Sequence, residues 1–295
     1  HKKAGELVSR GKIHADMTQA QPAGSYGWIL DVTKKVYIVL ILLTMGFMLP
    51  HNLADLYRKA VSGWPRPFGI STDPKERGWH SHPAEERMTL NERYQHALLL
   101  ITFIGLAYTG FGHRYPDSLF NTVFFAGTEG GALRTLLHRV LAALFMALAV
   151  YHAVWLVGLR KGRERLLALL PGLNDVRDFF HLQKYNIFHN GEPPAFGHYT
   201  YMEKIEYWAL IWGSVVMAVT GCVVWFRELS LQYLPKWLID LCLLIHFMEA
   251  ILACISILVW HFYWTVFDPA VYPMNWAWLT GKVARPENDT SKHVG

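Results

Sequence analysis

The feature of this sequence that most constrains its fold is an apolar stretch at residues 241–267, LCLLIHFMEAILACISILVWHFYWTVF. Roughly 20 apolar residues in a helix cross the hydrocarbon core of a bilayer, so this stretch is long enough to span a membrane. It contains His246 and His261, which an α-helix would place roughly 22 Å apart along its axis and about 60° apart around it. Each imidazole would then lie near one leaflet, and both would face the same side of a helix bundle.

Ionisable side chains inside a membrane span are costly and usually face a functional interior. Two imidazoles near opposite leaflets suit two stacked haems, each of which takes one axial ligand from this helix. A single histidine in such a stretch is more simply interpreted as buried and hydrogen-bonded to a neighbouring helix. The pair, with matching histidines in other apolar stretches, favours haem ligation.

The composition also indicates a membrane protein. Apolar residues make up 52% of the 295 residues, with 12 Trp, and charged residues make up only 17% and cluster between the apolar stretches. The net charge of +5 forms no basic stripe of the kind that binds nucleic acid. The three cysteines, Cys222, Cys242 and Cys254, form no Cys-x-x-Cys pair or Cys-x-x-Cys-His motif, so neither an iron–sulfur cluster nor a covalently attached haem is predicted.

Five apolar stretches predict an all-α integral membrane helical bundle. The first apolar run, residues 36–49, is shorter than a full span and is ended by Pro50. Residues 29–32 and 53–56 could extend it into a spanning helix, and an interfacial helix is the alternative. We expect an extramembrane N-terminal tail (1–35), a first transmembrane helix (36–57), a cytoplasmic connection (58–93), a four-helix di-haem core (94–267), and an interfacial segment with a cytoplasmic tail (268–295). Within the core, residues 160–197 are expected to form a basic segment followed by a polar loop.

The orientation follows from the Lys and Arg residues of the connections. Residues 52–93 and 160–204 hold seven each, whereas residues 113–134 and 227–236 hold two each. Because positive loops stay in the cytoplasm, the two large connections and the C-terminus are predicted to lie there. Five spans then place the N-terminus outside, although its own six basic residues oppose this. The chain starts at His1, and we expect its N-terminus to be processed or incomplete.

The alternating direction of the spans sorts the histidines into two levels. His138 and His246, each early in its span, fall at the outer level, and a haem with both as axial ligands follows. His261, His96 and His152 fall at the inner level. His138 and His152 share a helix face because they are 14 residues apart. The inner haem takes His261 with either His96 or His152, and spacing alone leaves that choice open.

Four segments carry a resemblance to a known family: NERYQHALLLITFIGLAYTGF, LRTLLHRVLAALF, FGHYTYMEKIEYWALIWGSVVMAVTGCVVWF and LLIHFMEAILACISILVWHFYW. They resemble the core helices of the membrane cytochrome b subunits of formate dehydrogenase-N, nickel–iron hydrogenases and thiosulfate reductases. The resemblance covers roughly residues 90–283, and the histidine positions are its specific part. It implies two b-type haems, one on His138 and His246 and the other on His96 and His261.

Two features depart from that pattern. The last helix has one more residue between its histidines than the formate dehydrogenase subunit, and His152 is additional to that subunit's set. The spacings are also similar to the cytochrome b and b6 core of quinol–cytochrome c reductases, in which His152 would ligate the inner haem. Arg93, Gly110 and the neighbourhood of Gly221 favour His96. His152 would then be an alternative ligand, a quinone-bonding group or a structural histidine.

The resemblance also implies a quinone, menaquinone or ubiquinone, near the inner haem. The segment that lines the quinone pocket in the family falls on residues 198–208, HYTYMEKIEYW. Quinone reduction takes two protons, which carboxylates or imidazoles can supply. The residues expected to bind the quinone are His198, Tyr199, Thr200, Glu203 and Glu206, with Tyr201 as another possible flank of the ring. Thr200 and Met202 stand where the family has an Asn and a Gly, and an interfacial Tyr/Trp belt is the alternative interpretation.

Glu249 lies inside the last span, three residues after His246, and must be protonated, paired or part of a proton route. A di-iron site would need more inward-facing glutamates than the spans contain. Membrane desaturases would need closely spaced His-x-x-x-His clusters, which are absent from the sequence. A proton-coupled transporter would explain Glu249 but not five histidines in two layers.

The sequence therefore predicts a multi-pass di-haem cytochrome b of the bacterial cytoplasmic membrane. It would transfer electrons between the quinone pool and a partner redox subunit, either an iron–sulfur protein or a multihaem cytochrome c, with no catalytic residue of its own. The alternatives are a cytochrome b6-like quinol oxidoreductase core and a membrane anchor or proton-conducting subunit without haem. The basic tail, with His1 and His14, is expected to dock an extracytoplasmic redox protein.

Overall fold

The computed structural model describes residues 26–61, 85–125, 130–188, 194 and 196–283. His1, His14 and the rest of the N-terminal tail up to residue 25 lie outside the described residues, so the docking expectation stays a prediction. Along the described chain the elements are α2 (Gly27–Val61), β1 (Glu85–Glu86), α3 (Leu90–Arg114), α4 (Leu119–Phe124), α5 (Gly130–Gly158), α6 (Arg160–Leu169), α7 (Leu173–Phe188), α8 (Tyr201–Trp225), α9 (Arg227–Tyr233), α10 (Lys236–Ser256), the π-helices η1 (Ile257–His261) and η2 (Tyr263–Phe267), α11 (Ala277–Thr280) and β2 (Lys282–Val283).

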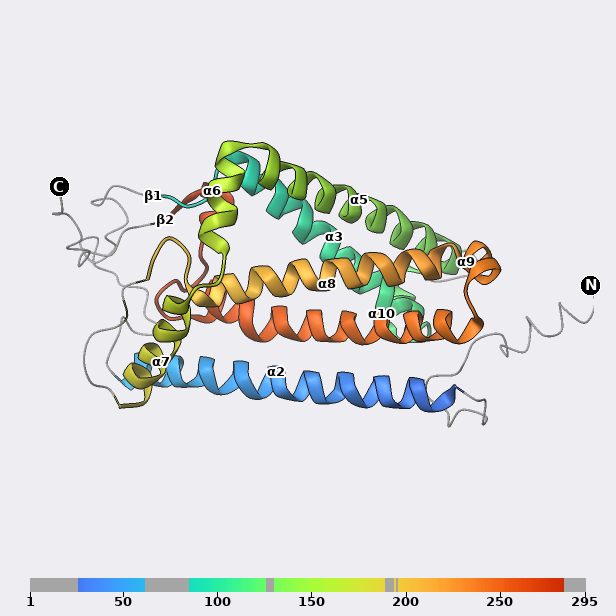
Figure 1. Cartoon of the computed structure of the whole chain (residues 1–295), viewed down its shortest axis with the longest axis horizontal. Helices are drawn as coiled ribbons and strands as arrows, with labels where there is room; N and C mark the ends of the chain where they lie inside the picture. The colour runs from blue at the N-terminus through green and yellow to red at the C-terminus, as the bar shows by residue number, and fades with distance from the viewer. Residues whose placement is uncertain (1–25, 62–84, 126–129, 189–193, 195, 284–295) are drawn as a thin grey trace, which may run out of the picture. The chain divides into compact units, whose positions relative to one another are not determined.

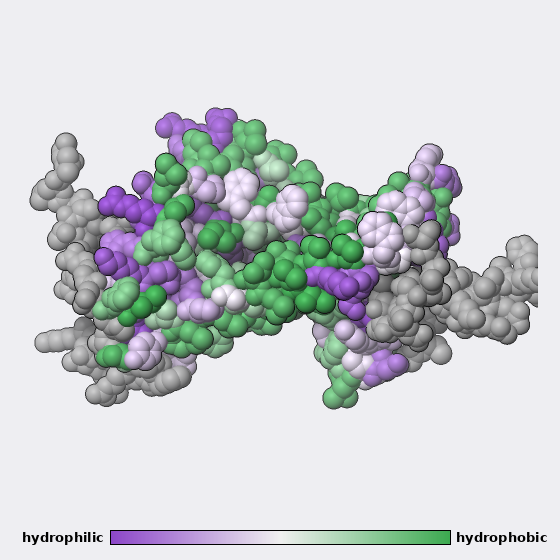
Figure 2. All heavy atoms as spheres, turned by 60° about the horizontal axis from the view of Figure 1, so that its bottom comes forward, coloured by the Kyte–Doolittle hydropathy of each residue, from purple (hydrophilic) through white to green (hydrophobic). Residues whose placement is uncertain are grey.

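Five of these helices are long and apolar enough to cross a membrane: α2, α3, α5, α8 and the continuous run from α10 through η2. The predicted all-α membrane bundle is thereby confirmed. Large apolar side chains remain at the surface of the helices, as a bilayer-facing surface requires (Figure 2). In α2, for example, Leu42 and Leu43 are 65% and 68% exposed.

The chain divides into two compact units. The first comprises His1–Gly46 and Trp208–Ser256. Here the N-terminal half of α2 packs on α10, with Leu30, Leu244 and Met248 buried at the centre of the contact. Because lipid tails are as apolar as leucine, such packing inside a bilayer stabilises the contact through van der Waals interactions and not through removal from water.

The second unit comprises Phe47–Tyr207 and Ile257–Gly295. Its centre is the hairpin of α3 and α5, which lie side by side, while α6 turns back against the end of α5 (Figure 1). The short helix α11 packs on α3, and β1 pairs with β2 in an antiparallel two-residue ladder, Glu85 opposite Val283 and Glu86 opposite Lys282. This unit contains His96, His138, His152 and His261.

The first helix differs from the predicted span in both directions. It begins at Gly27 rather than near residue 36 and ends at Val61 rather than near residue 57, with Pro50 inside the helix in both cases. Proline lacks an N–H and usually kinks or ends a helix. Here the residues after Pro50 are held by tertiary contacts of the second unit, including those of the buried His51, Asn52 and Asp55.

The polar loop that the sequence predicts after the basic segment, up to residue 197, is wrong for most of its length, because α6 continues to Leu169 and α7 covers Leu173–Phe188. Both are short and amphipathic, and each places buried leucines, Leu169 and Leu182, among charged residues. The many charged residues of α6 and α7 mask the helical spacing of their apolar residues in the sequence. The connection between α3 and α5 also holds a short helix, α4.

Candidate functional site

The imidazole of His138 is held by the helix that precedes it. Thr109 Oγ1 in α3 lies 2.8 Å from His138 Nδ1 and donates its own hydrogen to the carbonyl of Gly105. Since the threonine hydrogen is already used, His138 Nδ1–H is the donor to Thr109 Oγ1. The neutral ring then carries its lone pair on Nε2, the atom that a metal ligand needs.

A glycine makes room for the same ring. A Cβ added to Gly110 would lie 3.4 Å from His138 Cε1. At this distance a Cβ would already be in van der Waals contact with the ring, so the glycine leaves the space beside the imidazole open.

The arrangement recurs at His246, inside the other unit. Thr220 Oγ1 in α8 lies 3.0 Å from His246 Nδ1 and donates to the carbonyl of Val216. A Cβ added to Gly221 would lie 3.1 Å from His246 Cε1. His246 Nδ1–H is again the donor, and Nε2 again carries the lone pair.

The two copies reflect a repeat in the sequence. Thr89, Glu92, Thr109 and Gly110 recur at identical spacing as Thr200, Glu203, Thr220 and Gly221. At the start of each copy, Thr and Glu form a reciprocal capping box, in which each side chain accepts from the other's backbone N–H. Each helix thus opens with the same cap and carries the same threonine–glycine pair, beside a histidine, within its last two turns.

The pair formed by His96 and His261 brings two imidazoles close together without direct contact. Their ring centroids are 6.3 Å apart, with the planes inclined at 35°. Glu206 Oε1 lies against His261 Nδ1 in a close ion-pair contact that lacks the geometry of a hydrogen bond. A carboxylate at this place favours a proton on Nδ1, which leaves Nε2 as the atom that could ligate a metal. His96 Nδ1 is buried and has no hydrogen-bond partner among the described residues.

Both ring nitrogens of His152 are hydrogen-bonded. Nδ1 lies 2.6 Å from Gln95 Oε1, and Nε2 lies 3.0 Å from the hydroxyl of Tyr207. An amide oxygen only accepts, so Nδ1–H donates to Gln95 and the Tyr207 hydroxyl donates to Nε2 of the neutral ring. Ligating a metal would require His152 to break one of these bonds.

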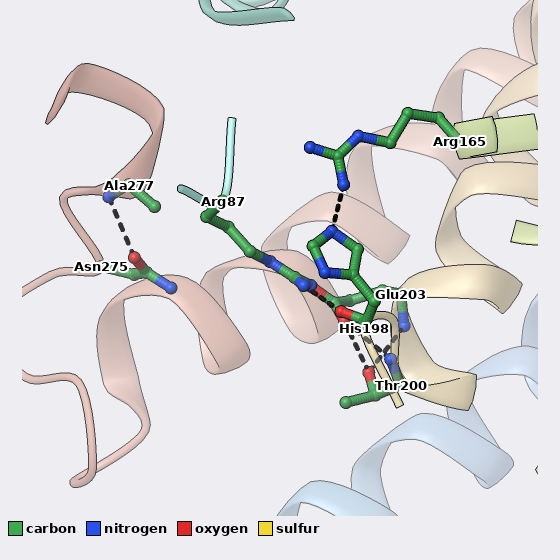
Figure 3. A network of polar contacts seen from close by, with 7 residues as sticks. All are labelled: Arg87, Arg165, His198, Thr200, Glu203, Asn275 and Ala277. Atoms are coloured by element: carbon green, nitrogen blue, oxygen red, sulfur yellow. Dashed lines mark hydrogen bonds and ion pairs between the residues drawn. The ribbon is translucent and has the colours of Figure 1, made fainter. Parts of the chain in front are cut away.

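The segment predicted to line a quinone pocket is held by two arginines (Figure 3). Arg165 donates to His198 Nε2, and Arg87 donates to the His198 carbonyl and to Glu203 Oε1. The other oxygen of Glu203 accepts from the N–H and hydroxyl of Thr200. Both carboxylate oxygens of Glu203 are therefore engaged, although its side chain is 41% exposed.

Tyr199 lies between the same two arginines. The guanidinium carbon of Arg87 is 4.8 Å from the centre of the tyrosine ring, and that of Arg165 is 5.9 Å away. Burial raises the pKa of the Tyr199 hydroxyl, and the positive charge of Arg165 opposes this shift. The hydroxyl therefore stays protonated at neutral pH.

A hollow of about 310 Å³ adjoins this network, and His198 and Arg165 line it together with Glu92 and Trp155. Glu92 also pairs with Arg165, with 3.1 Å between Oε1 and Nε. Of the residues expected to bind a quinone, His198 lines this hollow. Glu206 instead contacts His261, and Thr200 caps α8.

Comparison with known families decides what kind of protein this is. The family model for prokaryotic cytochrome b561 matches residues 87–274, which is more than half of the chain. The chain belongs to this family. It is therefore a multi-pass membrane cytochrome whose family binds haem b. No curated protein matches the chain.

The residues of the cytochrome fit a haem at His96 and His261. An imidazole nitrogen lies about 2 Å from a metal that it ligates, so two axial rings on one iron have centres about 6 Å apart. The observed separation of 6.3 Å agrees with this value. The carboxylate on the far nitrogen of His261 is the partner that metal-bound imidazoles commonly have.

The cytochrome also shows how Glu249 is accommodated inside a span. The hydroxyl of Tyr37 donates to Glu249 Oε2 at 3.0 Å, and the glutamate is buried. A Cβ added to Gly213 would lie 3.1 Å from Glu249 Oε1. The buried Glu249 side chain is therefore hydrogen-bonded inside this unit.

Sequence reasoning identified the histidines but missed the residues that orient them: Thr109, Thr220, Gln95, Tyr207, Arg87 and Arg165. The repeated threonine–glycine pair was the available signal for two of them. The others become visible only when separate helices are brought together.

Proposed function

We propose that this cytochrome carries two b-type haems and transfers electrons between a quinone pool and a partner redox subunit. The observation that carries the proposal is the facing pair of His96 and His261, at the separation that a shared iron requires. A b-type haem with two axial imidazoles supplies reversible one-electron transfer.

The chain's own residues would hold the two groups at fixed places. His96 and His261 would bind one haem, and Glu206 would keep His261 Nδ1 protonated and its ring oriented. His138 and His246 would bind the other haem, because the sequence predicts both at the outer level. The imidazole of each is hydrogen-bonded to a threonine hydroxyl. His152 would be structural, since both of its nitrogens already have partners.

The quinone would bind at residues 198–208 and the adjoining hollow. Its volume lies at the low end of the range for ligand pockets, about 300–1,000 Å³. Glu92 and His198 line the hollow and could exchange protons with a quinone, while Arg165 holds both side chains in place. Tyr199, which stays protonated, could donate a hydrogen bond to a quinone oxygen.

The membrane would be the bacterial cytoplasmic membrane, with the inner haem and the quinone site toward the cytoplasm. Electron transfer through the chain needs a donor and an acceptor, and the quinone is one of them. A partner subunit with iron–sulfur clusters or multiple c-type haems would be the other.

The test is the haem content and reduced-minus-oxidised spectrum of the purified chain and its single variants. The wild type should hold two b-type haems, both reduced by a quinol. His96→Ala and His261→Ala should each lose one haem and keep the other, because one axial ligand of the same iron is removed. His152→Ala should keep both.

Two results would count against this assignment. A wild-type chain with no Soret absorption would refute haem binding by this protein. Loss of one haem in His152→Ala, with both retained in His96→Ala, would show that the cytochrome b6-like pairing is the correct one.

A further inference from the structure

We infer that the C-terminal half of α2, which precedes the family match at residue 87, positions the haem ligand His261 by holding the π-helices that carry it. The inference rests on the proposed role of His261. The contacting residues, His51, Asn52, Asp55 and Lys59, recur at the three- and four-residue spacing of one helix face. All of them lie in the second unit, as do His261 and both π-helices.

The segment around His261 needs external support because its geometry is unusual. The α-helix α10 ends at Ser256, and the chain continues as π-helices over Ile257–His261 and Tyr263–Phe267. π-Helices are rare, occur mostly as single turns and are frequent at functional sites. A turn of this kind can shift if its backbone is not held by neighbouring side chains.

The first contact is to the π-helix backbone. Asn52 Nδ2 donates to the carbonyl of Val259 at 2.7 Å, and Asn52 is 6% exposed. Val259 lies two residues before His261, inside η1. A buried side-chain donor on this carbonyl fixes the turn that sets the direction of the ligand.

The second contact is a buried ionic network. Lys59 Nζ lies 2.6 Å from Asp55 Oδ2 and 2.7 Å from Asp268 Oδ1. The hydroxyl of Tyr263, two residues after His261, donates to Asp55 Oδ2 at 2.6 Å. Asp55, Tyr263 and Asp268 are each at most 6% exposed, so breaking this network would leave a buried charge or carboxylate without its partner.

The third contact involves aromatic rings. Trp260, directly before His261, is 1% exposed, and its ring lies 4.9 Å from that of His51. His51 Nε2 is also hydrogen-bonded to the hydroxyl of Tyr201 at 2.5 Å. Tyr201 opens the helix that carries Glu206, the partner of His261. One face of α2 thus contacts both elements that orient the ligand.

The experiment compares two variants that remove a single contact each. Asn52→Leu keeps the approximate volume but has no donor for the Val259 carbonyl, and Tyr263→Phe removes only the hydroxyl on Asp55. Tyr37→Phe is the matched control, because it also removes a hydroxyl from a buried carboxylate, Glu249, but in the other unit. The readouts are haem content, the low-field EPR g value and the midpoint potential of each haem.

The inner haem is the one whose signals disappear in His96→Ala. Asn52→Leu and Tyr263→Phe should shift its g value and potential while both haems stay bound, and Asn52→Gln, which keeps a donor, should reduce the shift. Selective loss of the inner haem would also support the inference. Tyr37→Phe should leave the inner-haem signals unchanged.

Inner-haem signals identical to wild type in both variants would overturn the inference, even if the melting temperatures fall, because the face would then be only structural. The milder Asn52→Ser replaces Asn52→Leu if the latter does not accumulate. A wild-type chain without haem would instead refute the proposed function, so the two failures are distinguishable.

Discussion

At the scale of single residues, the threonine–histidine contacts orient the two imidazoles that we propose as ligands of one haem. A threonine whose hydrogen is used within its own helix can only accept from the imidazole. This fixes the protonated nitrogen of His138 and of His246 and leaves Nε2 as the ligand atom. The histidines were readable from the sequence, and a repeated threonine–glycine pair marked the threonines. The bond between Thr109 and His138 was not readable, because the two residues meet only when α3 packs on α5.

Thr109→Val should weaken the haem bound by His138 while preserving the fold. Valine has nearly the shape of threonine but cannot accept from His138 Nδ1–H, which leaves a buried donor unsatisfied at a cost of about 1–3 kcal/mol. Loss of such a partner lowers metal affinity by roughly 10–100-fold. Haem content during titration with haemin would measure the effect, and Thr109→Ser, which keeps the hydroxyl, is the control.

Thr220→Val should behave in the same way, because Thr220 stands to His246 as Thr109 stands to His138. Equal haem affinity in the threonine and valine proteins would show that the hydroxyls do not orient the ligands.

The helices themselves show where sequence patterns succeed and where they stop. Hydropathy located all five spans, because a run of about 20 apolar residues in a chain of this composition indicates a membrane-spanning helix. It failed for α6 and α7, whose charges masked a narrow buried face, and it placed the start of α2 too late. It also gave no sign of the π-helices, in which the backbone has i→i+5 bonding in place of the α-helical pattern.

The two capping boxes permit a sharp test of the quinone segment. Glutamine can replace glutamate in a capping box, so Glu203→Gln keeps the cap on Thr200. It removes the charge that faces Arg87, and for a partly exposed ion pair this costs at most about 1 kcal/mol. We expect nearly unchanged stability and both haem spectra, but slower reduction of the haems by quinol, because a proton acceptor is lost.

The measurement is stopped-flow haem reduction by a short-chain quinol. Asp31→Asn is the control, because it neutralises one member of another exposed ion pair, that with Lys35 in α2. If Glu203→Gln and the control reduce their haems at the same rate, Glu203 is a helix cap without a part in quinone chemistry, and the interfacial-belt interpretation holds for this segment.

For the molecule as a whole, the arrangement of the second unit restricts which connections share a side of the membrane. The spans α3 and α5 pack against each other and follow one another in the chain. The connection that carries α4 therefore lies at the end of this hairpin opposite to α6, which follows α5. The basic residues concentrate at the α6 end of the hairpin, which also holds Arg165 and the hollow beside His198.

The positive-inside rule then predicts that α6 and α7 face the cytoplasm, so that a quinone at this end exchanges protons with the cytoplasm. Cysteines introduced at the exposed Asn174 in α7 and Asp117 before α4 would test this in intact cells. A membrane-impermeant maleimide should label Asp117→Cys at once and Asn174→Cys only after permeabilisation. The unsubstituted chain, whose Cys222, Cys242 and Cys254 lie in the spans, gives the background. The reverse labelling pattern would place the quinone end outside and make proton exchange extracytoplasmic.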